Sequence, residues 1–292
     1  DFGRSWLAMR RAPSSCLCTA AAAAAASSAS FRAAAPLRKL VVSGREVRVR
    51  QHFMDVPVPQ ARRRAADLTG LKVWPCSLRL LHHYESDVLP RLLQRRRASG
   101  DDAPLRVLEL GSGVGALGLG IAAVGGARVV LTDPGVAVNL AADYSSNTLD
   151  WLAANVADNE AALRERAPAV RRLVWGDEAH TAALLAEFAS PFDLVVGAEL
   201  LYDPDQYPAL LRALDAFVAG GTLALLGFTH RHEGERRFFE GAAAAGFRTA
   251  TQWREGEGAV PRWATVEIER AAGGAAWSRL PRGGEEEEGT MT

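Results

Sequence analysis

The chain has 292 residues, a formal net charge of zero and 48% hydrophobic residues, a balance typical of one globular domain with appendages. The zero net charge provides no general basic field for nucleic acid. Three cysteines, at positions 16, 18 and 76, are too few for a disulfide framework or a four-thiolate zinc site. We therefore expect a monomer in a reducing compartment, with no metal, no nucleic-acid partner and no membrane partner.

Residues 1–39 have the composition of a leader. From residue 2 to residue 45 the chain contains no Asp or Glu, but it is rich in Arg and Ser, which is typical of an organelle transit peptide. The alanine run Ala20–Ala26 is too short and too weakly apolar to span a membrane. We expect localisation to a chloroplast or mitochondrion. If the segment is instead a disordered tail, the protein is expected in the cytoplasm.

Residues 40–104 predict an N-terminal extension made of a hairpin and a helix. Hydrophobic and polar residues alternate over Val41–Val49 around a Ser-Gly turn, which indicates a β-hairpin. Leucines at 78, 80 and 81 indicate a helix beginning in Ser77–Tyr84, and Pro90 must kink or restart it.

The stretch Leu105–Asp133 reads as a strand, a glycine-rich turn, a helix and a second strand that ends in an acid. Glycines at 111, 113, 115 and 118 permit backbone conformations closed to other residues and let a ligand approach the main chain. Asp133 follows Gly113 by about 20 positions, the spacing at which nucleotide-binding αβ units place a carboxylate that binds ribose hydroxyls. We expect a ribose-containing ligand, the alternative being a structural turn without one.

The rest of the chain continues this alternation. A Pro-Gly turn after Asp133 is followed by one or two predicted helices up to Asn159. Further strands are expected at 170–175, 192–198, 222–228, 247–253 and 263–268, and helices at 181–188, 206–218 and 233–245. Alternation of this kind predicts an α/β fold over residues 105–270, a doubly wound, mostly parallel, seven-stranded Rossmann-like sheet. The last strand should be antiparallel, because the loop before it is too short for a crossover. Residues 271–292 should be a disordered acidic tail.

Ligands of such sheets bind at the carboxyl ends of the strands. An aromatic ring can stack on adenine and a carboxylate can accept its amino group, and Trp175 and Asp177 supply both at one predicted strand end. Glu109, inside the first strand, stands where dinucleotide-binding folds usually carry an apolar residue. Together with the GxGxG turn, Glu109 resembles the first motif of class I methyltransferases, and this resemblance favours S-adenosylmethionine over NAD or FAD.

Over Leu68–Ile268 the chain resembles the seven-β-strand protein-lysine methyltransferases of methyltransferase family 16, which have a class I methyltransferase fold. The resemblance is carried by Thr69-Gly70 with Val73-Trp74-Pro75, VLELGSGVGALG at 107–118, Thr132-Asp133, Asn155 with Asn159, Val174–Asp177 and Phe192–Tyr202. It implies S-adenosylmethionine as the cofactor and a protein lysine side chain as the substrate. The residues expected to contact or frame the cofactor are Trp74, Glu109, Gly111, Ser112, Gly113, Asp133, Trp175, Asp177 and Ala198. The D/E-x-x-Y motif of that family, near the substrate amine, falls on Glu199 and Tyr202.

Several alternatives remain beside this hypothesis. Glu199 replaces the commoner Asp, and residues 134–150 are longer and poorer in the usual helix pattern than in typical members. A small-molecule methyltransferase of the same fold and a non-catalytic cofactor-binding module are the main alternatives. A nucleic-acid or glutamine amino-methyltransferase and a dehydrogenase are less favoured, because Glu199–Tyr202 is not an Asn/Asp-Pro-Pro-Tyr loop and a dehydrogenase would lack the other motifs. A structural alternative also exists, in which Glu199 caps a helix starting near Asp205 and Tyr202 packs beneath it.

Overall fold

A computed structural model describes most of the chain. The described residues are 34–52, 69–138, 146–188, 191–230, 234–254 and 262–271. Outside them lie residues 1–33 of the predicted leader 1–39, residues 272–292 of the predicted tail 271–292, and residues 255–261, where the sequence predicts a loop. Within the described ranges, every helix is too short or too polar to cross a bilayer.

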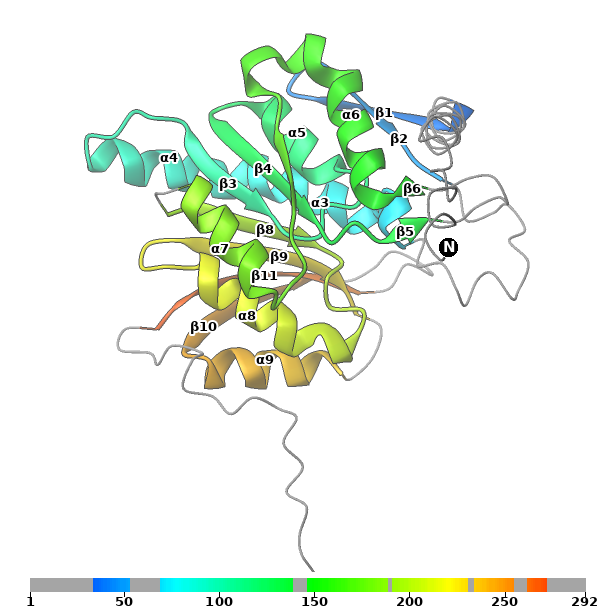
Figure 1. The fold of residues 1–292 in the computed structure, drawn as a ribbon. Helices are drawn as coiled ribbons and strands as arrows, with labels where there is room; N and C mark the ends of the chain where they lie inside the picture. The colour runs from blue at the N-terminus through cyan, green and yellow to red at the C-terminus, as the bar shows by residue number, and fades with distance from the viewer. Residues whose placement is uncertain are drawn as a thin grey trace, which may run out of the picture.

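A seven-stranded sheet forms the centre of the molecule (Figure 1). Its strands, in spatial order, are β10 (Phe247–Arg254), β11 (Trp263–Arg270), β9 (Leu223–Thr229), β8 (Leu194–Ala198), β3 (Leu105–Glu109), β4 (Ala127–Asp133) and β7 (Ala169–Arg172). Neighbouring strands from β9 to β7 are parallel, whereas β11 pairs antiparallel with both β9 and β10. The predicted doubly wound class I fold, with its antiparallel last strand, is confirmed.

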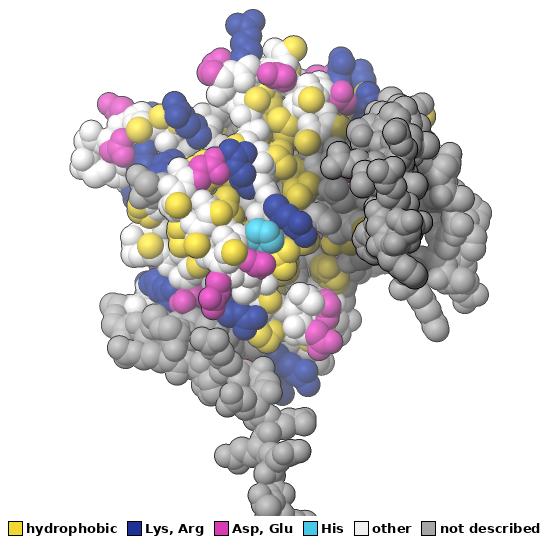
Figure 2. Space-filling model, in the orientation of Figure 1, with side chains coloured by type: hydrophobic (Ala, Val, Ile, Leu, Met, Phe, Trp, Pro, Cys, Tyr) yellow, Lys and Arg dark blue, Asp and Glu magenta, His cyan; other side chains and the backbone are white. Residues whose placement is uncertain are grey.

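Helices cover both faces of the sheet (Figure 1). One face is covered by α3 (Pro75–His83), α4 (Leu89–Ala98), α5 (Ala116–Val124) and α6 (Thr148–Leu163), and the other by α7 (Glu178–Glu187), α8 (Tyr207–Phe217) and α9 (Glu235–Ala244). Because successive side chains of a strand point to opposite faces, Val107 packs in the first core and Leu108 in the second. On the side of the molecule in Figure 2, basic and acidic side chains are interspersed.

The predicted hairpin is formed by β1 (Leu37–Val42) and β2 (Arg45–Arg50). Asn155 of α6 accepts a hydrogen bond from the Arg50 N–H at 2.8 Å and donates to the Arg50 carbonyl at 3.0 Å. Asn159, one helical turn later, makes the same pair of contacts with Arg48, at 2.8 and 2.6 Å. Two side-chain amides thus pair with the edge of β2 as a neighbouring strand would, which satisfies its backbone groups.

The extension and the sheet share one hydrophobic core. Val47 of the hairpin, Leu80 of α3 and Leu105 of β3 belong to a single buried cluster. The expected boundary at residue 104 therefore does not separate two cores. Pro90 restarts the helix as expected: a five-residue π-helix, η2 (Tyr84–Val88), joins α3 to α4, and Pro90 lies in the first turn of α4, where no backbone donor is needed.

Two regions differ from the sequence-based expectation. After Asp133 the chain forms a short antiparallel pair, β5 (Ala137–Val138) and β6 (Ser146–Asn147), and α6 begins only at Thr148, so the prediction of helix immediately after the Pro-Gly turn is wrong. Asn147 and Asp150 form a capping box, with both hydrogen bonds at 3.1 Å, which fixes that start. The strand predicted to reach Trp175 ends at Arg172. Short 3₁₀ turns complete the described elements: η1 (Thr69–Leu71), η3 (Arg164–Arg166) and η4 (Pro204–Gln206).

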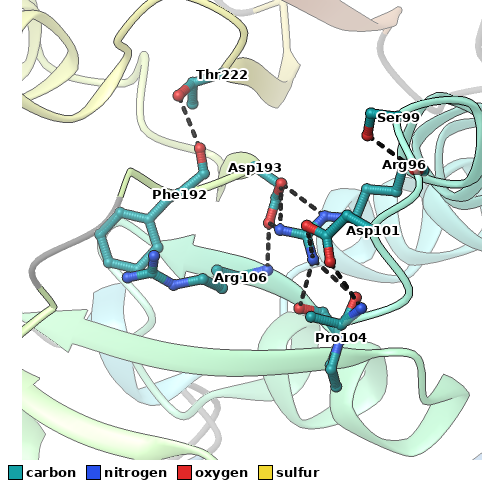
Figure 3. Close-up of polar contacts among 9 residues, drawn as sticks. Arg96, Ser99, Asp101, Pro104, Arg106, Phe192, Asp193 and Thr222 are labelled. Atoms are coloured by element: carbon teal, nitrogen blue, oxygen red, sulfur yellow. Dashed lines mark hydrogen bonds and ion pairs between the residues drawn. The ribbon is translucent and has the colours of Figure 1, made fainter.

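An ion-pair network holds the amino ends of β3 and β8 (Figure 3). Asp193 accepts hydrogen bonds from Arg96 on both carboxylate oxygens at 2.9 Å, and from the Arg106 N–H at 2.7 Å. Arg96 also donates to the carbonyls of Ala103 and Pro104. This network ties α4 to the sheet at the edge opposite the carboxyl ends of the strands.

We predict that Asp193→Ala lowers the free energy of unfolding by about 2–4 kcal/mol, because it leaves the largely buried Arg96 guanidinium and the Arg106 N–H without their acceptor. Urea unfolding measures this loss. Glu187→Ala removes the exposed ion pair with Arg171 and serves as the control, since solvent screens that pair. Equal effects of the two substitutions would contradict the structural role of Asp193.

Candidate active site

The carboxyl ends of β3, β4 and β8 open into a cavity of about 390 Å³, a volume typical of small-molecule sites. Nearly all of the residues chosen from the sequence line it: Trp74, Glu109, Gly111, Ser112, Gly113, Asp133, Trp175, Ala198, Glu199 and Tyr202. Residues of five separate stretches of sequence therefore meet at the edge of the sheet where ligands of such folds bind.

The glycine-rich turn has the backbone that only glycine adopts readily. Gly111 and Gly113 have φ values of +61° and +52°. A Cβ on Gly113 would lie 2.5 Å from the carbonyl oxygen of Gly70, so the segment around Gly70 packs directly on the turn. A side chain at position 113 would therefore disturb packing as well as any bound ligand.

Asp133 is the buried acceptor of the cavity, with 5% of its surface exposed. Its carboxylate accepts hydrogen bonds from the N–H groups of Gly113 at 3.0 Å and Gly135 at 3.1 Å, and from the Thr148 hydroxyl. Three segments of the chain are thereby held together by hydrogen bonds to the Asp133 carboxylate. Thr148 also lines the cavity, and the sequence analysis missed it because it placed the start of α6 too early.

Glu109 orders the glycine-rich turn from beneath. Its carboxyl group is 3% exposed and accepts a hydrogen bond from the Gly118 N–H at 3.1 Å. Burial raises the pKa of Glu109 to about 8, a rise that hydrogen bonds from Ser112 and Gly118 partly offset and the nearby Asp133 charge increases. Near neutral pH the group is therefore mostly protonated.

Glu199 forms a left-handed corner directly after β8. Its φ is +60°, its surface is 7% exposed, and its N–H donates to the Gly227 carbonyl at 2.7 Å. The carboxylate accepts hydrogen bonds from the Thr229 hydroxyl at 2.5 Å and, more weakly, from the Thr229 N–H at 3.4 Å. Strained backbone of this kind is characteristic of functional sites.

The capping alternative for Glu199 and Tyr202 is wrong. The turn before α8 is capped by Asp203, whose carboxylate accepts from the Asp205 N–H at 3.1 Å. Tyr202 does not pack beneath a helix, since 41% of its surface is exposed at the cavity mouth. Both residues line the cavity.

Asp177 differs from the other candidates, because it is absent from the described lining of the cavity. Its carboxylate caps α7, accepting from the His180 N–H at 2.9 Å, and that hydrogen bond lowers its pKa. The interpretation of Asp177 as an adenine contact assumed a strand reaching Trp175, which the structure does not have. Trp175 does line the cavity, with its ring beside Gly111.

A second group of potential ligand atoms lies outside the cavity. Atoms of His83, Asp87 and Glu267 are within 4.8 Å of one another. The Arg91 guanidinium donates to both carboxylates, at 2.9 Å in the case of Asp87. Because a fixed positive charge already pairs with both carboxylates, we interpret this group as an ion-pair network.

Comparison with known proteins shows to which family this arrangement corresponds. A family model described as lysine methyltransferase matches residues 60–244. Protein N-lysine methyltransferase METTL21A of Danio rerio is 35% identical over 133 residues, which are 46% of this chain and 53% of that protein. EEF1A lysine methyltransferase 3 of Xenopus tropicalis is 28% identical over 68% of this chain and 70% of its own length. The chain spans about half the length of the METTL21A relatives it matches.

A solved structure, the METTL16 MTase domain, has a TM-score of 0.48 to this chain and is 14% identical, over 67% of this chain and 68% of that one.

The raised pKa of Glu109 predicts a pH dependence of stability. In the unfolded chain this carboxyl has its ordinary pKa of 4.5, whereas in the folded protein it keeps its proton to about pH 8. Unfolding between these values releases a proton, so the stability contribution falls as pH rises through this window. Glu109→Gln keeps an acceptor for Gly118 and cannot ionise. The melting temperature of the wild type relative to this variant should therefore fall between pH 5 and pH 8, and parallel melting curves at all pH values would contradict the assignment.

Proposed function

Because the chain belongs to the lysine methyltransferase family, whose model matches residues 60–244, we propose that it transfers a methyl group from S-adenosylmethionine to the ε-amine of a lysine in a protein substrate. The observation that carries the proposal is that Glu199 and Tyr202 line the same cavity as Asp133 and the glycine-rich turn. One cavity thus contains a residue that can bind a ribose and residues that can bind an incoming amine.

The residues of the cavity fit the cofactor. Asp133 can accept from ribose hydroxyls, the Trp175 ring offers a face for adenine, and the Cβ-free turn at Gly111 and Gly113 leaves room for the amino-acid part beside the backbone. When bound, the cofactor supplies a methyl group attached to a positively charged sulfur. A neutral amine can attack the methyl carbon and displace the sulfur. A structural turn without a ligand does not account for a cavity of about 390 Å³ at this edge.

The chain contributes positioning and electrostatics to this reaction. A lysine ammonium has a pKa of about 10.4 in water and must lose its proton before its nitrogen can attack. The Glu199 carboxylate, held by Thr229, can receive the ammonium, which then gives its proton to solvent water. The Tyr202 hydroxyl can orient the lone pair that this leaves on the nitrogen. Desolvation in the narrow cavity favours the neutral amine.

The open mouth favours a substrate that reaches the site with a long side chain. Tyr202 is 41% exposed there, so a lysine on another protein can extend past it. The mixed charges on the side in Figure 2 differ from the single-sign basic field that binds nucleic acid. A small-molecule amine remains the second candidate, because it would use the same cavity.

We predict that the protein binds S-adenosylhomocysteine and not NADH. Asp133, Glu109 and the glycine-rich turn together are the reason, and isothermal titration calorimetry measures both ligands on the same preparation. Tight binding of NADH without heat from S-adenosylhomocysteine would overturn the cofactor assignment and, with it, the proposed reaction.

We predict that Glu199→Gln and Tyr202→Phe each reduce methyl transfer by roughly ten- to a thousand-fold, the scale of one lost positioned contact. Cofactor affinity and melting temperature should be nearly unchanged, since both replacements preserve shape. Transfer of labelled methyl to protein substrates measures the rate. Asp205→Asn is the matched control: it changes a nearby exposed carboxylate outside the described cavity lining and should leave the rate intact. Full turnover by either test variant would make that residue structural.

A further inference from the structure

The cavity has an unequal distribution of charge. Four acidic residues line it, Glu109, Asp133, Glu199 and Asp203, of which Glu109 keeps its proton near neutral pH because burial raises its pKa to about 8. Lys72 is the one cationic side chain among the described lining residues. A ligand carboxylate entering this cavity would meet several acids and a single ammonium. An unpaired carboxylate is costly to remove from water. Backbone N–H groups and neutral side chains such as Ser77 and Gln206 can donate to it, but Lys72 is the one described lining residue that can also balance its charge.

Lys72 is held on the cavity wall by its neighbours. The Leu71 carbonyl accepts from the His52 N–H at 2.8 Å, and the Val73 N–H donates to the Gln51 side chain at 2.9 Å. The end of the hairpin therefore anchors the backbone on both sides of Lys72. This lysine is not on a freely moving loop, although its side chain is only half-buried.

The ammonium itself has a defined contact. The Lys72 Nζ lies 5.0 Å from the centroid of the Trp74 ring, within the range of a cation–π interaction. The Trp74 indole N–H donates to the Thr69 carbonyl at 2.9 Å, which fixes the ring. Gly70, in the same segment, packs against Gly113 of the glycine-rich turn. The lysine segment and the turn are therefore adjacent walls of one cavity.

We propose that Lys72 binds the α-carboxylate of the cofactor's amino-acid moiety. The inference rests on the proposed function and deepens it: S-adenosylmethionine carries two cationic groups, which suit the acids of the cavity, and one carboxylate, which needs a positive partner. Lysine is a compact point charge that can reach a carboxylate without a fixed fork geometry. Lys39, the other lysine of the chain, pairs with Glu46 on the hairpin and is not among the cavity residues.

The test compares two ligands that differ only in the carboxylate. Calorimetry with S-adenosylhomocysteine and with its decarboxylated analogue measures how strongly the carboxylate contributes to binding. The wild type should bind the intact ligand about 10- to 100-fold more tightly, the worth of one charge-assisted hydrogen bond. Lys72→Met should remove this difference by weakening only the intact ligand, Lys72→Arg should retain much of it, and Lys39→Met should leave it unchanged.

Each outcome has a distinct meaning. Equal affinity of the wild type for both ligands, or an undiminished difference in Lys72→Met, would overturn the role of Lys72. Failure of the wild type to bind either ligand would instead overturn the proposed function. Lys72→Met also removes the cation–π contact with Trp74, but that loss affects the binding of both ligands equally. It therefore cannot remove the difference in affinity between the two ligands. The melting temperature without ligand reports whether Lys72→Met is folded.

Discussion

The buried carboxylate of Asp133 is the interaction on which the site depends. It ends β4, and it holds the N–H of Gly113 in the turn after β3, the N–H of Gly135 in the next loop and the hydroxyl of Thr148 at the start of α6. A desolvated charge requires several donors, and here those donors come from segments that would otherwise be independent. The hydrogen bonds that this buried carboxylate requires thus fix the relative positions of the cavity walls.

The N-terminal hairpin extends this framework. Asn155 pairs with the edge of β2 and also donates to the Val114 carbonyl in the glycine-rich turn, at 2.8 Å. Beyond the end of β2, Gln51 and His52 hold the segment that carries Lys72 and Trp74. Two amide side chains, those of Asn155 and Asn159, take the place of a neighbouring strand at the edge of β2. The hairpin, which lies outside the main sheet, is thereby connected to the walls of the cavity.

Much of this architecture could be predicted from the sequence, because apolar runs ending in Gly or Asp mark the strands and their ligand-binding ends. The order of β3, β4 and β8 follows from the doubly wound pattern, and the cavity gathers the residues at those ends. The predicted adenine contact of Asp177 fails because Trp175 and its neighbours resemble the continuation of a strand. An aspartate directly before a helix is also a favourable N-cap residue, and this is the role that Asp177 has. The hydrogen bond from Thr229 to Glu199 joins positions 30 residues apart, and no local pattern encodes it.

The scarcity of lysine has a chemical consequence for an enzyme proposed to alkylate lysines. The chain carries lysine only at positions 39 and 72, and arginine supplies its other fixed positive charges. Lys39 is occupied in an ion pair on the hairpin, far along the chain from the cavity residues. Lys72 lines the cavity in which the transfer is proposed to occur. Its contact with the Trp74 ring is made by the ammonium, which has no lone pair. The protein thereby presents its own cavity with a cation and not with a competing nucleophile.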